Sequence, residues 1–287
     1  MELMEDVRAG DWLLARAGGW AQVDGVAGTG FEAYARILHP VPARRVDPAD
    51  TDSWGIPRTV EEGRWRWADV AARTGATMHP LVQWRSLTGG EQDPELPGDW
   101  SVQSPEQGLL DTDLLAALTE HLAPATSTPQ QLVAGLWTGH GELHDGGVRF
   151  VVLVTDGEAD DLPDTAPVTE HAVPRDVRAR ALSGPFLDWP GREMLLFSTS
   201  AGELADPSWP RAAGWGWSEE WGAGMTPQLL WPAGHEWALA SEIDWDSTIV
   251  AGSAELVAAI LADPRLEAFP VGPEDALTDD SDLVNGS

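Results

Sequence analysis

Three acidic side chains stand close together in the segment 237–248. Glu242, Asp244 and Asp246 alternate with Ile243 and Trp245, and successive side chains of a β-strand point to opposite faces. We therefore expect the three carboxylates to share one face of a strand. Such a face suits a divalent cation such as Mg²⁺ or Ca²⁺, or an arginine or lysine side chain of a partner protein. The third interpretation is a solvated sheet face, or carboxylates that cap the turn into Ser247 and Thr248.

Two histidines and a glutamate form a second candidate cluster. In an extended segment, His140, Glu142 and His144 would lie on one face, a ligand set compatible with a transition metal. The neighbouring glycines, Gly139 and Gly141, favour instead a hairpin tip with exposed histidines. Elsewhere, Arg36, Tyr34 and His39 would form part of a pocket only if the fold brings the three side chains together.

Tryptophan dominates the aromatic residues: the chain has 16 tryptophans, 5 phenylalanines and one tyrosine. Seven of the indoles fall between residues 209 and 245, among glycines and prolines that favour loops. Aromatic surfaces of this kind bind proteins, peptides or sugars, and the alternative is a hydrophobic plug that closes a sheet. The indoles that we expect to line a binding surface are Trp215, Trp217, Trp221, Trp231 and Trp245.

Composition excludes several classes of function. All 17 basic residues are arginine, and with 47 acidic residues the net charge is −30. This charge repels phosphate backbones and anionic lipids, so we expect no direct contact with nucleic acid and no membrane association. Without cysteine or lysine, the chain forms no disulfide and no Schiff base. The acidic N-terminus does not resemble a signal peptide, and we expect a cytoplasmic location.

Hydrophobic periodicity predicts alternating strands and helices. Strands are expected at 31–38, 148–154, 194–197 and 237–244. Helices are expected at 67–74, which Gly75 would end, and at 110–122, whose first turn Asp111 or Asp113 would cap. Thr128-Pro-Gln-Gln131 has the form of a capping box and predicts a short helix before a strand near Leu136. A last helix should begin at Ser253 and end before Pro264.

These elements follow no strict βαβ order, which favours an α+β fold with a mixed, mainly antiparallel sheet and helices packed on it. We expect one domain over residues 1–270 and an acidic, solvated tail over 271–287. A division into two lobes near residue 125 is the alternative. The stretches 89–108 and 156–174, rich in Gly, Pro and acidic residues, are predicted loops.

Two segments resemble conserved blocks of a tryptophan-rich actinobacterial protein family that has no assigned function. They are GFEAYARILHPV at 30–41 and LWPAGHEWALASEIDWDSTIVAGS at 230–253. The resemblance extends through 67–84, 126–137 and 190–197, and it implies no catalytic residues. In its expected tryptophan-rich mixed fold and its acidic surface, the chain is also similar to SUKH-type immunity proteins of bacterial toxin systems.

The sequence therefore favours a soluble, non-enzymatic binding protein. An acidic, tryptophan-lined surface over residues 215–246 would bind a basic protein partner, without a cofactor. The alternative is a hydrolase that uses Mg²⁺ or Ca²⁺ on Glu242, Asp244 and Asp246, with His235 as a base. Carbohydrate binding on the indoles is a third possibility.

Overall fold

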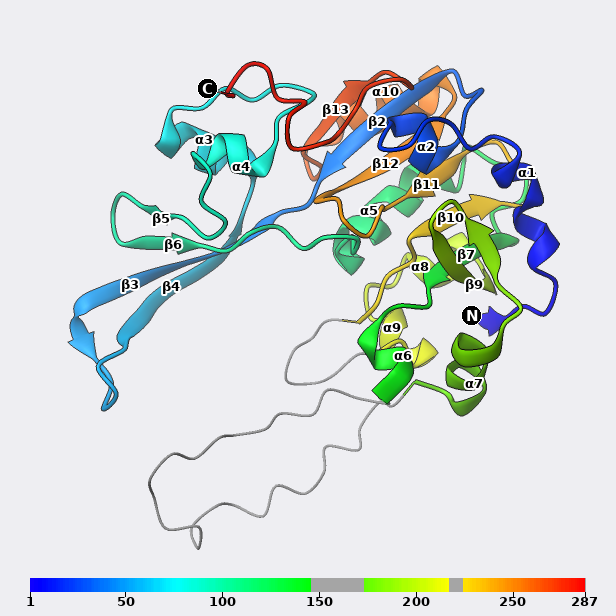
Figure 1. The fold of residues 1–287 in the computed structure, drawn as a ribbon, viewed down its shortest axis with the longest axis horizontal. Helices are drawn as coiled ribbons and strands as arrows, with labels where there is room; N and C mark the ends of the chain where they lie inside the picture. Colours follow the sequence, from blue (N-terminus) through cyan, green and yellow to red (C-terminus); the bar gives the residue numbers. More distant parts are fainter. Residues whose placement is uncertain (146–172, 217–223, 287) are drawn as a thin grey trace, which may run out of the picture.

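The computed structural model describes residues 1–145, 173–216 and 224–286. Within these ranges the chain folds into two antiparallel sheets with helices packed against them, which confirms the expected α+β class. Figure 1 shows the larger sheet beside a smaller one, whose strands β3 (Val41–Thr51) and β4 (Pro57–Trp65) extend away from the rest of the molecule.

The larger sheet contains strands from both halves of the chain. Strands that precede and follow residue 125 pair directly in it, as β2 (Ala33–Leu38) and β12 (Ser247–Gly252) do. Its spatial order is β1 (Glu2–Leu3), β9 (Arg192–Thr199), β7 (Leu132–Trp137), β10 (Leu229–Pro232), β11 (Ala238–Ala240), β12 (Ser247–Gly252), β2 (Ala33–Leu38) and β13 (Ala268–Val271), and β8 (Leu187–Trp189) also pairs with β9.

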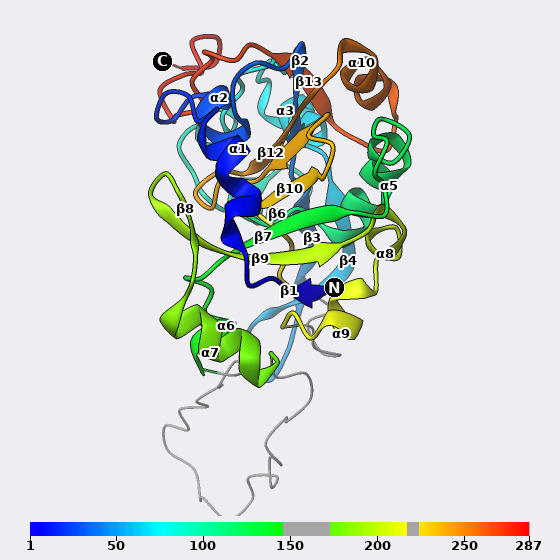
Figure 2. The ribbon, with the colours of Figure 1, turned by 90° about the vertical axis from the view of Figure 1, so that its right-hand side faces the viewer.

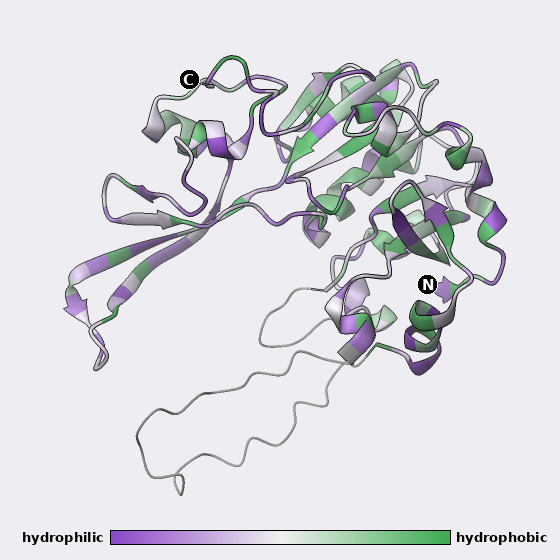
Figure 3. Cartoon of the chain, in the orientation of Figure 1, coloured by the Kyte–Doolittle hydropathy of each residue, from purple (hydrophilic) through white to green (hydrophobic). Residues whose placement is uncertain are grey.

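Both faces of this sheet are covered. Ala35 and Ile37 of β2 face one hydrophobic core, whereas Tyr34 faces another on the opposite side. The strands at the centre of the sheet are accordingly buried along nearly their whole length, and many of their residues are hydrophobic (Figure 3). This double burial explains why the predicted strand 31–38 is found, at Ala33–Leu38, as a nearly continuous buried run.

Helices and short turns cover the two faces of the larger sheet from opposite sides (Figure 2). Apolar residues of these elements belong to, or pack against, one of the two cores. One side carries α5 (Thr112–Leu122), α6 (Gly141–Asp145), α7 (Arg175–Ser183), α8 (Ala201–Leu204), α9 (Trp209–Ala213) and α10 (Ala254–Ala262). The other side carries η1 (Val7–Gly10), α1 (Asp11–Leu14) and α2 (Val23–Ala27).

The smaller sheet has a core of its own. Its order is β4, β3, β6 (Trp100–Val102) and β5 (Glu95–Leu96). Helices α3 (Trp67–Thr74) and α4 (Trp84–Leu87) pack against it around the buried indoles of Trp67 and Trp84. The stretch 89–108 is otherwise irregular, as predicted, but the short strands β5 and β6 interrupt the predicted loop.

Two helices with clear start or end signals in the sequence are found where those signals predict them. Helix α3 spans the predicted residues and ends at Gly75, which adopts the left-handed conformation with φ 82°. Helix α10 begins after Ser253, whose side chain accepts a hydrogen bond from the backbone N–H of Leu256. The strand predicted at 194–197 is found within β9. The strand predicted at 148–154 lies outside the described residues.

Two predicted helix starts differ from the structure. Asp111 precedes α5 but makes no capping hydrogen bond, because its carboxylate pairs with Arg64. The segment 128–131 forms a single turn, closed by a hydrogen bond from Gln131 N to Thr128 O at 3.0 Å, and leads directly into β7. The side chain of Thr128 accepts a hydrogen bond from Gly234 N instead of capping a helix.

The C-terminal segment is packed against the fold, which corrects the prediction of a solvated tail at 271–287. The backbone N–H of Val23 donates to Asp275 O at 3.0 Å, and Leu277 is buried beside α2. Further along, Asp282 is 3% exposed. The acidic composition of the segment conceals this packing, because Asp282 accepts a hydrogen bond from the backbone N–H of Gln83 instead of facing solvent.

Candidate functional site

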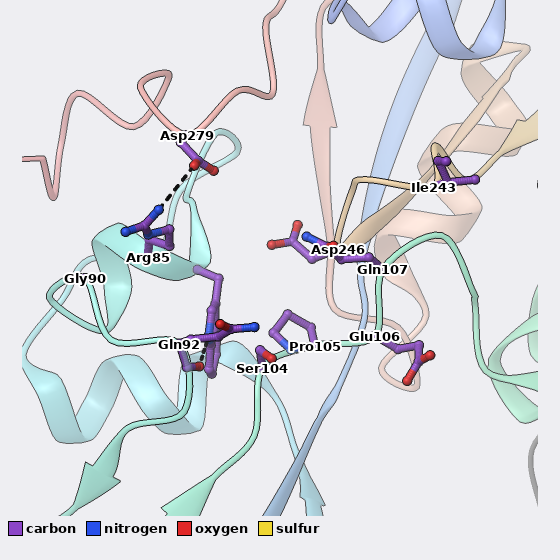
Figure 4. Close-up of a pocket in the computed structure, with 11 residues that line it drawn as sticks. Arg85, Gly90, Gln92, Ser104, Pro105, Glu106, Gln107, Ile243, Asp246 and Asp279 are labelled. Atoms are coloured by element: carbon purple, nitrogen blue, oxygen red, sulfur yellow. Dashed lines mark hydrogen bonds and ion pairs between the residues drawn. The ribbon is translucent and has the colours of Figure 1, made fainter. Parts of the chain in front are cut away.

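A cleft of about 820 Å³ opens where the two sheets meet. It lies between α4, the stretch after β6, the turn between β11 and β12, and the C-terminal segment. In Figure 4 the carboxylate of Asp246 extends into this space, with Arg85 and Asp279 on the opposite wall. The polar residues of the lining are Arg85, Gln92, Ser104, Glu106, Gln107, Asp246 and Asp279.

Asp246 is held at the cleft by a buried arginine. The side chain of Arg36, on β2, is 1% exposed, and its Nη2 donates to Asp246 Oδ1 at 3.3 Å. Its Nε donates to Ser247 Oγ at 2.9 Å, and its Nη1 to the carbonyl oxygens of Pro80 and Val82 at 3.2 and 2.7 Å. The guanidinium therefore joins the larger sheet to the segment that leads into α4.

Burial acts against the charged form of both partners. It lowers the pKa of Arg36 and raises the pKa of Asp246, and the attraction between the two groups opposes each shift. The Asp246 side chain remains 17% exposed. A positive group that entered the cleft would add a second favourable interaction for the ionised carboxylate.

A chain of buried hydrogen bonds fixes the wall formed by residues 104–107. His39, in the crossing between β2 and β3, contacts Glu106 O through Nδ1 at 2.6 Å and Thr248 Oγ1 through Nε2 at 2.8 Å. Because a carbonyl oxygen only accepts, Nδ1 carries the proton and Nε2 accepts from the Thr248 hydroxyl. Thr248 in turn accepts from Ser241 Oγ at 2.7 Å. His39 thus acts as a structural link behind the wall.

The opposite wall depends on Asp282. Its carboxylate accepts from the backbone N–H groups of Gln83 and Asn285 at 3.2 and 2.9 Å, and from His79 Nε2 at 2.8 Å. Burial alone raises the pKa of Asp282, but these hydrogen bonds outweigh it and lower the pKa to about 2. The C-terminal segment is thereby attached to the start of α4, and it carries Asp279, 3.8 Å from Arg85, to the rim of the cleft.

The three predicted carboxylates do not share a strand face. Strand β11 ends at Ala240, so Glu242, Asp244 and Asp246 lie in the turn before β12. Arg192, on β9, donates to Glu242 Oε1 at 2.7 Å and to Asp244 Oδ2 at 2.6 Å. The carboxylates are therefore divided between Arg192 and Arg36, and the predicted strand 237–244 is wrong beyond Ala240.

The geometry also separates the histidine cluster. His144 Nε2 contacts Thr138 O at 2.8 Å, and Glu142 and His144 lie on the short helix α6 rather than on an extended strand. Burial lowers the pKa of His140. Across 1–145, 173–216 and 224–286, no group of three or more His, Asp or Glu side chains is arranged to hold a metal ion.

The described indoles of the predicted tryptophan surface belong to a hydrophobic core or pack against one. Trp215 and Trp231 are each 1% exposed, and Trp215 packs against Phe197 with ring centroids 4.7 Å apart. Trp245 is partly buried against the core below α1 and α2. Trp217 and Trp221 lie outside the described residues. Among the indoles that the structure describes, the exposed ones are instead Trp20 and Trp54, which are 74% and 86% exposed.

Sequence reasoning named Asp246 but missed most of its surroundings. Arg36 and His39 do border the site. Tyr34 shares the sheet face of Arg36 but packs in the core beside α1 and α2, where its hydroxyl donates to Gly28 O. Arg85 and Asp279 carried no local signal, because nearly 200 residues separate them in the chain. Only the packing of the C-terminal segment brings them together.

The chain matches no protein-family model, no curated protein sequence and no solved structure. The resemblance to the actinobacterial family and to SUKH-type immunity proteins stays a prediction. Among the described helices, none is long and apolar enough to cross a bilayer.

Proposed function

We propose that this protein is a non-enzymatic binding protein for a basic protein partner, and that the cleft accepts an arginine or lysine side chain of that partner. The observation that carries the proposal is the carboxylate of Asp246, which is fixed from behind by Arg36 and directed into the cleft (Figure 4). Asp279 at the rim adds a second carboxylate. Amide and hydroxyl groups of Gln92 and Ser104 can complete the hydrogen bonds of a guanidinium.

The surface charge supports the same class of partner. Among the described acidic residues, only Asp24, Asp263 and Asp282 are buried, so the excess of carboxylates lies at the surface of a chain with net charge −30. A field of this sign accelerates the encounter with a positively charged protein and slows the encounter with an acidic one. The cleft would then supply short-range specificity that diffuse attraction lacks.

Binding of a labelled peptide tests the proposal. The probe is a fluorescein-labelled nona-arginine, and its neutral counterpart is the same peptide with citrulline, which keeps the shape but loses the charge. We expect the full-length protein to bind the arginine peptide in fluorescence anisotropy, and more weakly as NaCl increases. Asp246→Asn should weaken binding about tenfold, the loss of one close charge interaction.

Two variants separate the cleft from general acidity. Ser104→Trp fills the cleft without changing the net charge, and it should weaken binding as Asp246→Asn does. Glu255→Gln removes one exposed carboxylate on α10, and it should leave binding nearly unchanged. Equal binding of the citrulline peptide, or equal losses in Glu255→Gln and Asp246→Asn, would overturn the proposal.

A further inference from the structure

The hairpin of β3 and β4, residues 41–65, forms an arm that projects from the smaller sheet (Figure 1). Only its base pairs with another strand, through Ala43, Arg44 and Arg45 against β6. Val46 N still donates to Asp99 O, at 3.0 Å, and beyond Val46 the two strands pair only with each other. Every residue of β4 from Pro57 to Arg64 is exposed. An isolated two-stranded ribbon is marginally stable in water, so the arm lacks the packing that strands in sheets normally have.

Large apolar side chains are exposed on this arm, with Trp54 and Ile56 in the turn at its tip and Val60 further back on β4. Trp54 is 86% exposed, Ile56 61% and Val60 50%. Asp52 Oδ1 accepts hydrogen bonds from the backbone N–H groups of Trp54 and Ile56, at 2.8 and 2.9 Å, which orders the turn that carries them. An ordered turn that exposes an indole and an isoleucine is typical of a surface that another molecule covers.

The charges of the arm favour a second copy of this chain as that molecule. The arm contains four arginines and five acidic residues, so it is nearly neutral in a chain of net charge −30. Two copies can therefore approach through their arms with much less repulsion than through any acidic surface. For the same reason, the arm offers little attraction to a basic partner.

The charges are also divided along the arm. The base holds three arginines and two glutamates, a net charge of +1, and the part toward the tip holds three aspartates and one arginine, a net charge of −2. The basic residues of the base are Arg44, Arg45 and Arg64, beside Glu61 and Glu62, and the acidic residues toward the tip are Asp47, Asp50 and Asp52, beside Arg58. Two arms that lie side by side in opposite directions place the acidic tip of each against the basic base of the other. Arg44 is exposed at the base, where an acidic tip can reach it.

The base of the arm also offers an aromatic surface for an incoming tip. Trp65 and Trp100 are partly exposed, with ring centroids 4.4 Å apart, and the guanidinium of Arg73 lies 3.9 Å from the Trp65 ring. We propose that two copies of this protein associate through antiparallel arms, with Trp54 of each copy packed against the Trp65–Trp100 pair of the other. The contact is the same in both directions, as in a two-fold symmetric dimer.

This contact is made by side chains rather than by extension of the sheet. Strand β4 is the edge of the smaller sheet, and Pro57 removes one backbone donor from it. Val60 has no partner on β3, because Thr59 pairs with Val46 and Glu61 with Arg45. Proline and an irregular register both oppose the addition of another strand.

Sedimentation velocity on the full-length protein over a range of concentrations tests the proposal. We expect a monomer–dimer equilibrium, in which Trp54→Ser raises the dissociation constant at least about tenfold. Trp20→Ser is the matched control, because it removes an equally large exposed indole outside the arm, and it should leave the equilibrium unchanged. Arg44→Glu should also weaken the dimer, and Asp50→Arg added to Arg44→Glu should restore part of the loss.

The possible results are distinct. A dimer weakened by Trp54→Ser and not by Trp20→Ser supports the proposal. A monomer at every concentration overturns it, as does a dimer that is unaffected by Trp54→Ser. Equal losses in the two tryptophan variants also overturn it, because they would indicate non-specific apolar association. The outcome is independent of peptide binding in the cleft.

Discussion

At the scale of single residues, His39 connects the two sheets through a buried imidazole. It is 1% exposed and links Glu106 to Thr248 by two hydrogen bonds. Burial, reinforced by the nearby charge of Arg36, lowers its pKa from 6.5 to about 4. The imidazole is therefore neutral in the folded protein at pH values where it is protonated in the unfolded chain.

This shift predicts a pH dependence of stability. Between about pH 6.5 and pH 4 the unfolded chain binds a proton at His39 that the folded protein does not, so the free energy of unfolding falls as the pH falls. The contribution of one such group is at most about 1.4 kcal/mol per pH unit. In His39→Gln the amide can still donate and accept hydrogen bonds, but it does not titrate. With decreasing pH, the free energy of unfolding of this variant should therefore fall less steeply, by up to about 1.4 kcal/mol per pH unit. Urea unfolding at several pH values measures the difference.

A direct measurement of the imidazole complements the unfolding curves. In ¹⁵N-resolved NMR spectra the signal that disappears in His39→Gln should remain that of a neutral ring down to about pH 4. Titration of that signal near pH 6.5 would contradict the buried, neutral histidine. Equal pH slopes for the two proteins would contradict its contribution to stability.

The residues of the candidate site show what a sequence can reveal. Asp246 stands in a run of carboxylates that is visible locally, but its partner Arg36 lies 210 residues earlier in the chain. Alternation predicted a shared strand face for Glu242 and Asp246, whereas the chain turns after Ala240 and each carboxylate meets a different arginine. Ion pairs between distant segments leave no periodic signal, so they were not predictable.

At the scale of elements, helix α10 and helix α5 begin in different ways. Ser253 precedes α10, and its hydroxyl accepts from Leu256 N at 3.2 Å. Asp111 precedes α5 without a capping hydrogen bond and pairs with Arg64, with both side chains nearly half exposed. The polar residue before α10 therefore stabilises its helix as a cap, whereas the polar residue before α5 contributes little to the free energy of unfolding.

Two alanine substitutions distinguish these helix starts. Ser253→Ala should lower the free energy of unfolding by about 1 kcal/mol, because one backbone N–H of the first turn loses its acceptor. Asp111→Ala should lower it by less than about 0.5 kcal/mol, because an exposed ion pair contributes little. Urea unfolding of the two variants beside the parent measures both values. Equal losses would mean that Asp111 caps α5 in solution.

Elements were predictable where their signals are local. Helix α3 is specified by its own buried stripe and by Gly75, and it spans the predicted residues. The segment 128–131 has an equally good local signal, but Glu236 binds the neighbouring Thr126 and Ser127, and Thr128 accepts from Gly234. These tertiary contacts hold the segment as a turn, and the next residues gain more by pairing in β7 than by continuing a helix.

At the scale of the whole molecule, stability is opposed by the surface charge. Nearly all described carboxylates are at the surface, and the chain carries 47 acidic residues against 17 arginines. Many of the arginines already pair with carboxylates, among them Arg192, Arg265 and Arg64. The remaining carboxylates repel one another in the folded state more than in the expanded chain.

Salt should therefore stabilise this protein. Raising NaCl from about 0.01 M to about 0.1 M shortens the screening length from about 30 Å to about 10 Å, and we expect the melting temperature to rise by several degrees. In a domain of this size 1 kcal/mol corresponds to about 2–4 °C. Choline chloride, whose bulky cation makes weak specific contacts, should have the same effect as NaCl. A constant or falling melting temperature would show that repulsion between the surface carboxylates does not significantly destabilise the folded protein.

The same experiment with Mg²⁺ separates screening from a specific site. Arg192 already binds Glu242 and Asp244, so Mg²⁺ should raise the melting temperature gradually and without saturation near one ion per chain. The rise should persist in Glu242→Gln, which removes one of three carboxylates that a metal site in this turn would need. A rise that saturates at stoichiometric Mg²⁺ and disappears in Glu242→Gln would mean that the ion displaces Arg192, because a bound ligand stabilises the native state by mass action. The turn between β11 and β12 would then be a metal site in solution, and a metal-dependent hydrolase would replace the basic-partner proposal.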